Sequence, residues 1–271
     1  MTRAVSLSQR VQKMKKSERL AAIPPNVRTK RYRNVLSDAF PETSLALVRF
    51  LKRKNRRSQR IPQWRVTQVQ NFVIALNATA FELERARHEG RTATLAWSAR
   101  NFLELSIWIE YCCASEENAK RFRQDTSRDL YGMIAAAKGV DINPELHKKV
   151  DALLQRFERI FNTNSFKVTD EFKKVGKAAA ELSREREFFS QNKFFSKMAH
   201  PTAFIVNSKS TKRFDRRFQA AVFIAGAGHA LKSMATLIDF FLAHFPDPNF
   251  KQTWNTPRPL SLSVDLWDEK K

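Results

Sequence analysis

Glycine and proline are scarce in this chain, and they fall between segments whose apolar residues have helical spacing. The 271 residues include 6 Gly and 10 Pro, and Pro62, Gly90 and Gly139 each stand at the edge of such a segment. Alternating apolar and polar runs, which are typical of strands, are rare. Since 42% of the residues are hydrophobic, the chain can bury a sizeable core. We therefore predict an all-α, multi-helix bundle with a basic helical N-terminal region and a Pro-rich C-terminal tail.

Capping residues and prolines set the expected helix boundaries. Ser115 and Asn143 are typical N-caps, and a helix must end at His200 because Pro201 disfavours helical geometry in the residue before it. The charged, weakly periodic segment 164–187 is expected to be a connector. The predicted regions are a basic N-terminal region (1–62), a helical core (63–245) and a tail (246–271). The predicted helices cover about 6–20, 27–39, 42–57, 62–88, 92–113, 115–138, 144–161 and 211–245, besides the one that ends at His200.

Basic residues outnumber acidic ones, and the excess is concentrated near the N-terminus. The chain has 49 Lys and Arg against 27 Asp and Glu, a net charge of +22, and residues 1–60 hold 17 of the basic and 3 of the acidic side chains. The electric field of such a charge attracts polyanions, of which nucleic acid is the first expectation and an anionic membrane or an acidic protein the second. The alternative is that the basic residues only keep a solvated surface soluble. The expected nucleic-acid-binding residues are Lys52, Arg53, Lys54, Arg56, Arg57 and Lys197.

The cysteines and the apolar segments bear on localisation. Cys112 and Cys113 are adjacent and cannot easily bridge each other, and the first residues lack the apolar run of a signal peptide. These features predict a reducing, cytoplasmic setting. The apolar segment 218–245 has the length of a membrane span, but His229 and Lys232 interrupt it. We expect it to be the central helix of a bundle, with His229 as a structural residue.

Common catalytic and cofactor-binding signatures are missing from the sequence. It contains no GxxxxGK[ST], GxGxxG, HExxH or CxxC pattern and no GxSxG elbow. Nucleotide-binding P-loop, dinucleotide-binding and zinc-site interpretations therefore lose their main support. We predict no cofactor and no metal site.

A small set of polar residues lies in or next to the most apolar segments. Arg100 and Glu104 are one helical turn apart in the apolar stretch 98–113, and buried charge is costly unless it is paired. The pair is either a salt bridge that locks packing or part of a site, and both interpretations stay open. His200 ends a helix that also carries Lys193 and Lys197. A helix C-terminus favours the charged imidazole, which is a better proton donor and phosphate partner.

Two stretches, "ARNFLELSIWIEYCCASEENAKRF" and "KFFSKMAHPTAF", carry a family resemblance. Together they resemble HEPN-like helical domains, in a branch where an Arg-x-x-x-Glu helix precedes a Ser-x-x-x-His segment. The resemblance implies a helical bundle, frequent homodimerisation and, as in many relatives, metal-independent RNA cleavage in toxin or antiviral defence systems. The family's nuclease signature is Arg, four to six residues, then His. In this sequence Lys193 takes the place of that Arg, and Lys lacks the bidentate fork of Arg.

Two functions follow as expectations. In the first, the protein binds RNA in preference to DNA and cleaves it, with His200 as general acid or base, Arg100 or Lys193 steadying the phosphorane, and Glu104 orienting Arg100 or His200. In the second, it is a non-catalytic interaction or regulatory subunit whose Arg, Glu and His cluster is structural. A homodimer is expected and a membrane partner is not. The Phe-rich stretch 188–195 is interpreted as core, with base stacking as the alternative.

Overall fold

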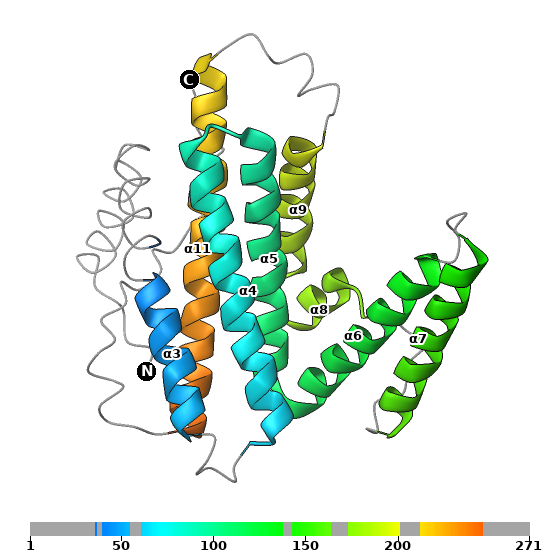
Figure 1. Cartoon of the computed structure of the whole chain (residues 1–271). Helices are drawn as coiled ribbons and strands as arrows, with labels where there is room; N and C mark the ends of the chain where they lie inside the picture. The colour runs from blue at the N-terminus through cyan, green and yellow to red at the C-terminus, as the bar shows by residue number, and fades with distance from the viewer. Residues whose placement is uncertain are drawn as a thin grey trace, which may run out of the picture.

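The computed structural model of the chain describes residues 36, 40–54, 61–137, 143–163, 173–200 and 212–245. In this part of the chain every regular element is a helix, which confirms the all-α prediction (Figure 1). The expected helices over 6–20 and 27–39 (Leu36 apart), the residues Arg56 and Arg57, and the tail 246–271 lie outside the described residues. The helices are α3 (Phe40–Lys54), α4 (Gln63–His88), α5 (Thr92–Ala114), α6 (Glu116–Ala137), α7 (Pro144–Thr163), α8 (Val175–Glu181), α9 (Glu185–Ala199) and α11 (Lys212–His244).

Local sequence signals place several helix ends where they were expected. The Ser115 hydroxyl accepts a hydrogen bond from the Asn118 backbone N–H (3.0 Å) at the start of α6, and the Asn143 side chain accepts one from the Glu145 N–H (3.0 Å) at the start of α7. Each satisfies a backbone donor that the first turn of a helix leaves open. At the end of α9, His200 is extended (φ −99°, ψ 151°), as the following proline requires.

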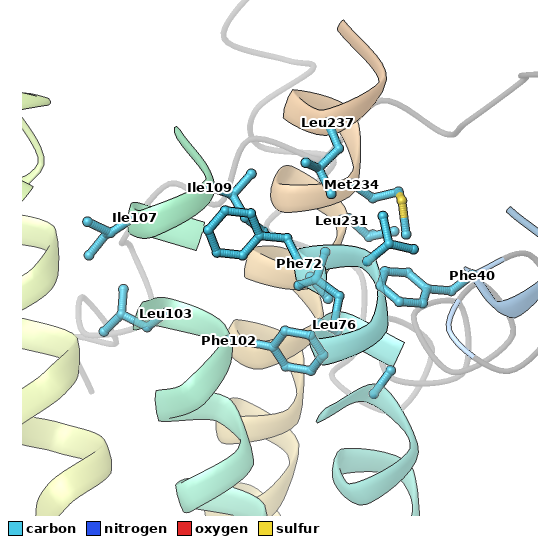
Figure 2. Close-up of a cluster of buried hydrophobic side chains, with 14 of the residues drawn as sticks. Phe40, Phe72, Leu76, Phe102, Leu103, Ile107, Ile109, Leu231, Met234 and Leu237 are labelled. Carbon is cyan, nitrogen blue, oxygen red and sulfur yellow. The ribbon is translucent and has the colours of Figure 1, made fainter. Parts of the chain in front are cut away.

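Helix α5 lies at the centre of the bundle and packs against α4, α6, α8, α9 and α11 (Figure 1). Its buried residues include Phe102, Leu103 and Ile107, none of which is exposed. These side chains meet apolar residues from α3, α4 and α11 in one continuous core, part of which Figure 2 shows. A helix that is apolar around most of its circumference is stable in water only when neighbours cover it, and α5 has neighbours on most sides.

Helix α11 is the other long core helix. The stretch Phe218–His244 is long and apolar enough to span a membrane, but 72% of its most apolar window is buried inside the bundle. It approaches α5 closely at Gly226, where a Cβ atom would lie 3.0 Å from the Ala99 Cβ and 3.1 Å from the Ala99 Cα. The absence of a side chain at Gly226 therefore permits the tight contact between the two central helices.

The core also includes residues that precede the expected boundary at residue 62. Phe40 and Leu47 of α3, together with Leu36 and Ile61, are buried in the same cluster as the apolar residues of α4, α5 and α11. Helix α3 packs against α4 (Figure 1). Helix α3, whose last turn is Lys52, Arg53 and Lys54, is thus attached to the bundle through the buried Phe40 and Leu47.

The prediction of a connector over 164–187 is wrong for its second half. Helix α8 spans Val175–Glu181, and α9 already begins at Glu185. Helix α8 is too short for a clear helical period, and its contribution to the core is the fully buried pair Ala178 and Ala179. Small apolar residues in a charged segment carry a weak hydrophobic signal, which is why periodicity did not reveal the helix.

Candidate functional site

Arg100 and Glu104 form an ion pair on the half-buried side of α5. The Arg100 Nε lies 3.0 Å from the Glu104 Oε1, and the side chains are 33% and 29% exposed. Both residues therefore lie at the edge of the core rather than inside it. Among the described residues, no hydrogen bond or ion pair joins either of them to His200, Lys193 or Lys197.

His200, Lys193 and Lys197 lie on the exposed side of α9. Because α9 runs antiparallel to α5 (Figure 1), the contact between Arg184 and Glu110 fixes the register between the two helices. At 1.5 Å per residue, Arg100 is level with about residue 194 of α9, and His200 lies about 9 Å further along the helix axis. The structure thus pairs Arg100 with Glu104 and places His200 further along α9, next to Lys197.

The exposed side of α9 carries a stripe of four basic residues and one phenylalanine, which we call the α9 stripe. It consists of Arg186, Phe189, Lys193, Lys197 and His200, all exposed. Spacings of three and four residues bring their side chains to one face of a helix. Glu185 and Glu187 lie in the first turn of α9, and past Glu187 the helix has no acidic residue. The α9 stripe therefore presents positive charge over almost its whole length.

The buried charge of the bundle is centred on Arg184, at the N-terminal end of α9. Its side chain is 6% exposed and donates to the Glu110 carboxylate of α5 (2.8 Å) and the Ser106 hydroxyl (3.0 Å). It also donates to both oxygens of Glu187, at 2.7 and 3.1 Å. Lys232 of α11 lies 3.3 Å from the same Glu110 oxygen. The guanidinium thus links α9 to α5, and Glu110 links α5 to α11 through Lys232.

His229 of α11 extends this network into the core. Its Nε2 is 2.6 Å from the Gln191 Oε1, and its Nδ1 is 3.8 Å from the Glu187 carboxylate. Burial lowers the pKa of His229 to about 4 even though Glu187 opposes the shift, with Arg184 adding to it. Burial by itself would raise the pKa of Glu187, but the hydrogen bonds and charge of Arg184 hold that pKa below its usual value. At neutral pH the network thus contains a neutral imidazole beside a carboxylate paired with a guanidinium.

Sequence reasoning missed Arg184, Glu187 and Glu110. The Arg184 partners on α5 lie 74 and 78 residues away in the chain, so no local pattern connects them. The turn that positions Arg184 depends on Ser183, whose positive φ of 57° ends α8, and such a conformation is not signalled by a serine. The spacing of Arg184 and Glu187, three residues apart, is typical of an ion pair on a helix. It was not used, because both residues fall within the segment 164–187 that was interpreted as a connector.

Five of the residues expected to bind nucleic acid lie in or just after α3. Lys52, Arg53 and Lys54 form the last turn of this helix, and Arg56 and Arg57 lie outside the described residues. Cys112 is buried and Cys113 is partly buried, and both are free thiols. Within the described ranges, no three His, Cys, Asp or Glu side chains are grouped so that they could hold a metal ion.

Two arrangements of polar residues therefore stand out, an exposed basic face and an ionic network around a buried guanidinium. The α9 stripe can meet an anionic partner, whereas the Arg184 network joins three helices through a cation that is 6% exposed. Comparison of the chain with protein-family models, with curated proteins and with solved structures gives no match.

Proposed function

We propose that the protein binds nucleic acid, with RNA as the expected form, and that the α9 stripe is a contact surface. The observation that carries the proposal is the exposure of Arg186, Lys193, Lys197 and His200 on one face of one helix. Such clustering of basic side chains on a helix face is the footprint of phosphate binding. The preference for RNA rests on the resemblance to HEPN-like domains.

The overall charge supports the same proposal. A net charge of +22 attracts a polyanion from a distance, and local contacts with the phosphates then fix the position of the complex. Neither Arg186 nor Lys193 forms an ion pair with an acidic side chain of the described part. Both cations are thus available to phosphates without first breaking a salt bridge.

Binding has more direct support than cleavage. A nuclease of the expected type needs its general acid or base and its phosphate-binding cation at the same phosphate. Arg100 is paired with Glu104 on α5, whereas His200 is on the exposed side of α9. The cations nearest to His200 on that face are Lys197 and Lys193, which suit phosphate contact as point charges.

The salt dependence of RNA binding tests the proposal. We expect the double variant Lys193→Ala/Lys197→Ala to bind RNA more weakly, and the slope of log affinity against log salt to become shallower by about 1.4 to 1.8. Lys120→Ala is a matched control, because Lys120 is 53% exposed and paired with Glu116 on α6. An unchanged slope in the double variant would place the phosphate contacts elsewhere. Incubating the RNA with wild-type protein in EDTA, and with His200→Ala, shows whether binding is accompanied by metal-independent cleavage.

A further inference from the structure

Phe189 differs from the other phenylalanines of α9 in its exposure. Phe188 and Phe195 are buried, and Phe194 is partly buried against the core, but the Phe189 side chain is 55% exposed. Its position in the middle of the α9 stripe is therefore not explained by packing alone. A large apolar ring in water is unremarkable when isolated, but this ring lies among cations.

The two nearest basic neighbours of Phe189 on the helix surface are Arg186 and Lys193. Arg186 precedes it by three residues and Lys193 follows it by four, which are the spacings at which side chains on a helix are neighbours. The ring is thus bordered by a cation on either side along the helix axis. This order of a cation, a flat ring and a second cation matches a chain in which charged phosphates alternate with flat bases.

Neighbouring groups hold the Phe189 ring in position. Its centroid is 5.4 Å from that of Phe188, with an angle of 63° between the rings, an edge-to-face arrangement. The tip of the ring also lies 3.4 Å from the point that a Cβ would occupy on Gly176 of α8. The exposed ring therefore rests on α8 and on Phe188, so that binding a flat partner requires little loss of side-chain entropy.

We propose that Phe189 stacks on an unpaired base while Arg186 and Lys193 contact the phosphates on either side, so that the α9 stripe takes single-stranded nucleic acid. The inference rests on the proposed function and specifies its ligand. A base is available for stacking on an aromatic side chain only where it is not already stacked inside a duplex. An acidic protein surface or an anionic membrane would satisfy the cations but has no flat group to match the ring.

Binding of matched RNA probes tests the inference. The probes are a labelled 12-nucleotide poly(U) strand and a duplex of equal length and mixed sequence, measured with full-length protein at one salt concentration. The wild type should prefer the single strand. Phe189→Leu should weaken single-strand binding by about 5- to 100-fold and leave duplex binding unchanged, whereas Phe189→Trp should keep the preference. Phe81→Leu is the matched control, because Phe81 is 65% exposed on α4 with the Arg85 guanidinium 5.8 Å from its ring centroid.

The outcomes separate this inference from the proposed function. If Lys193→Ala weakens both probes but Phe189→Leu weakens neither, nucleic-acid binding stands and stacking is overturned. Equal loss of both probes in Phe189→Leu also overturns it, because the ring would then act through general contact or folding. A lower melting temperature of Phe189→Leu would then indicate an effect on folding, and an unchanged melting temperature would indicate a general contact with both probes. If the wild type binds neither probe but binds acidic vesicles or an acidic polypeptide, both the inference and the proposed function fail.

Discussion

The guanidinium of Arg184 donates a 2.8 Å hydrogen bond to the carboxylate of Glu110, 74 residues earlier in the chain. This contact joins the start of α9 to the C-terminal half of α5. The same guanidinium also binds Glu187 and Ser106, so it helps to fix the position of α9, whose Phe188, Phe195 and Met198 are buried in the core. The exposed face of α9 is oriented by these contacts together.

Replacing Arg184 should be much more costly than replacing Arg100. Arg184→Ala leaves the Glu110 and Glu187 carboxylates without their guanidinium, and breaking a fully buried pair costs about 3–5 kcal/mol. Because these carboxylates are 30% and 32% exposed, the loss should lie near the lower end of that range. Arg100 is one-third exposed, and an exposed ion pair within a helix contributes at most about 1 kcal/mol, so Arg100→Ala should have a small effect. Urea unfolding of the two variants measures both free energies. Equal losses of unfolding free energy in the two variants would mean that Arg100 contributes more to stability than its partial exposure indicates.

Acidification should destabilise the protein through His229. Its pKa is about 4 in the folded state and about 6.5 in the unfolded chain, so the unfolded state binds more protons between these values. The contribution of the neutral imidazole is therefore fully present above pH 6.5 and is lost as the pH falls toward 4. Between pH 7 and pH 5 the loss amounts to about 2 kcal/mol.

The control for this pH effect is His229→Gln, which keeps a polar side chain near Gln191 but does not titrate. Unfolding free energies at pH 7, 6 and 5 should fall steadily in the wild type and change less in the variant. The pKa of Glu187 is held low by Arg184, so its own contribution is lost only at more acidic pH. The same slope in both proteins would contradict the assignment to His229.

Two glycine substitutions should have opposite effects. Gly226→Ala forces α5 and α11 apart, because the new Cβ would lie 3.0–3.2 Å from atoms of Ala99 and Leu83, and overpacking of this kind typically costs about 1–3 kcal/mol. Gly132→Ala meets nothing within 4 Å on α6 and should stabilise the helix by about 0.5–1 kcal/mol. Melting temperatures that move in the same direction would contradict the close approach at Gly226.

The two thiols should be unreactive while the protein is folded. Burial raises the pKa of Cys113 to about 12, and it raises the pKa of Cys112 further. Since the thiolate is the reactive form, labelling with a thiol reagent at pH 8 should be slow in buffer and complete in 6 M guanidinium. Rapid labelling in buffer would show that this part of the bundle opens readily.

Removing residues 1–35 should weaken RNA binding without unfolding the bundle. This segment holds 10 basic residues and 1 acidic residue, whereas Leu36, Phe40 and Leu47 belong to the core. A deletion that ends before Leu36 therefore keeps the buried residues of α3. The slope of log affinity against log salt should become shallower, with little change in melting temperature. A large loss of stability would show that the deleted segment also packs on the core.

Local signals made much of the fold predictable. Ser115, Asn143 and Pro201 each act on backbone groups within four residues, so a sequence pattern is enough to find the helix ends that they set. The apolar character of residues 98–113 likewise indicated that this helix is buried. The short helix α8 was missed because two buried alanines give little periodic signal in a charged segment.

The polar residues were less predictable for a different reason. The sequence singled out Arg100 because its helix is apolar, but the side on which a charge lies depends on which neighbours cover the helix, and α5 leaves its Arg100 side half open. The buried cation Arg184 lies next to three other charged residues, Glu185, Arg186 and Glu187, and nothing in that run marks one of them as internal. Burial of a charge is a property of tertiary packing.

The central place of α5 also governs the order in which the bundle can be completed during synthesis. Its closest partner, α11, begins 98 residues after α5 ends. Until Lys212 and the residues after it leave the ribosome, the sides of α4 and α5 that pack against α11 in the finished bundle would have no cover. An uncovered apolar surface of this kind is prone to aggregation and to chaperone binding. A chain terminated prematurely between α9 and α11 would therefore present the apolar face of α5 permanently, and its fate would be proteolysis or precipitation rather than a smaller folded protein.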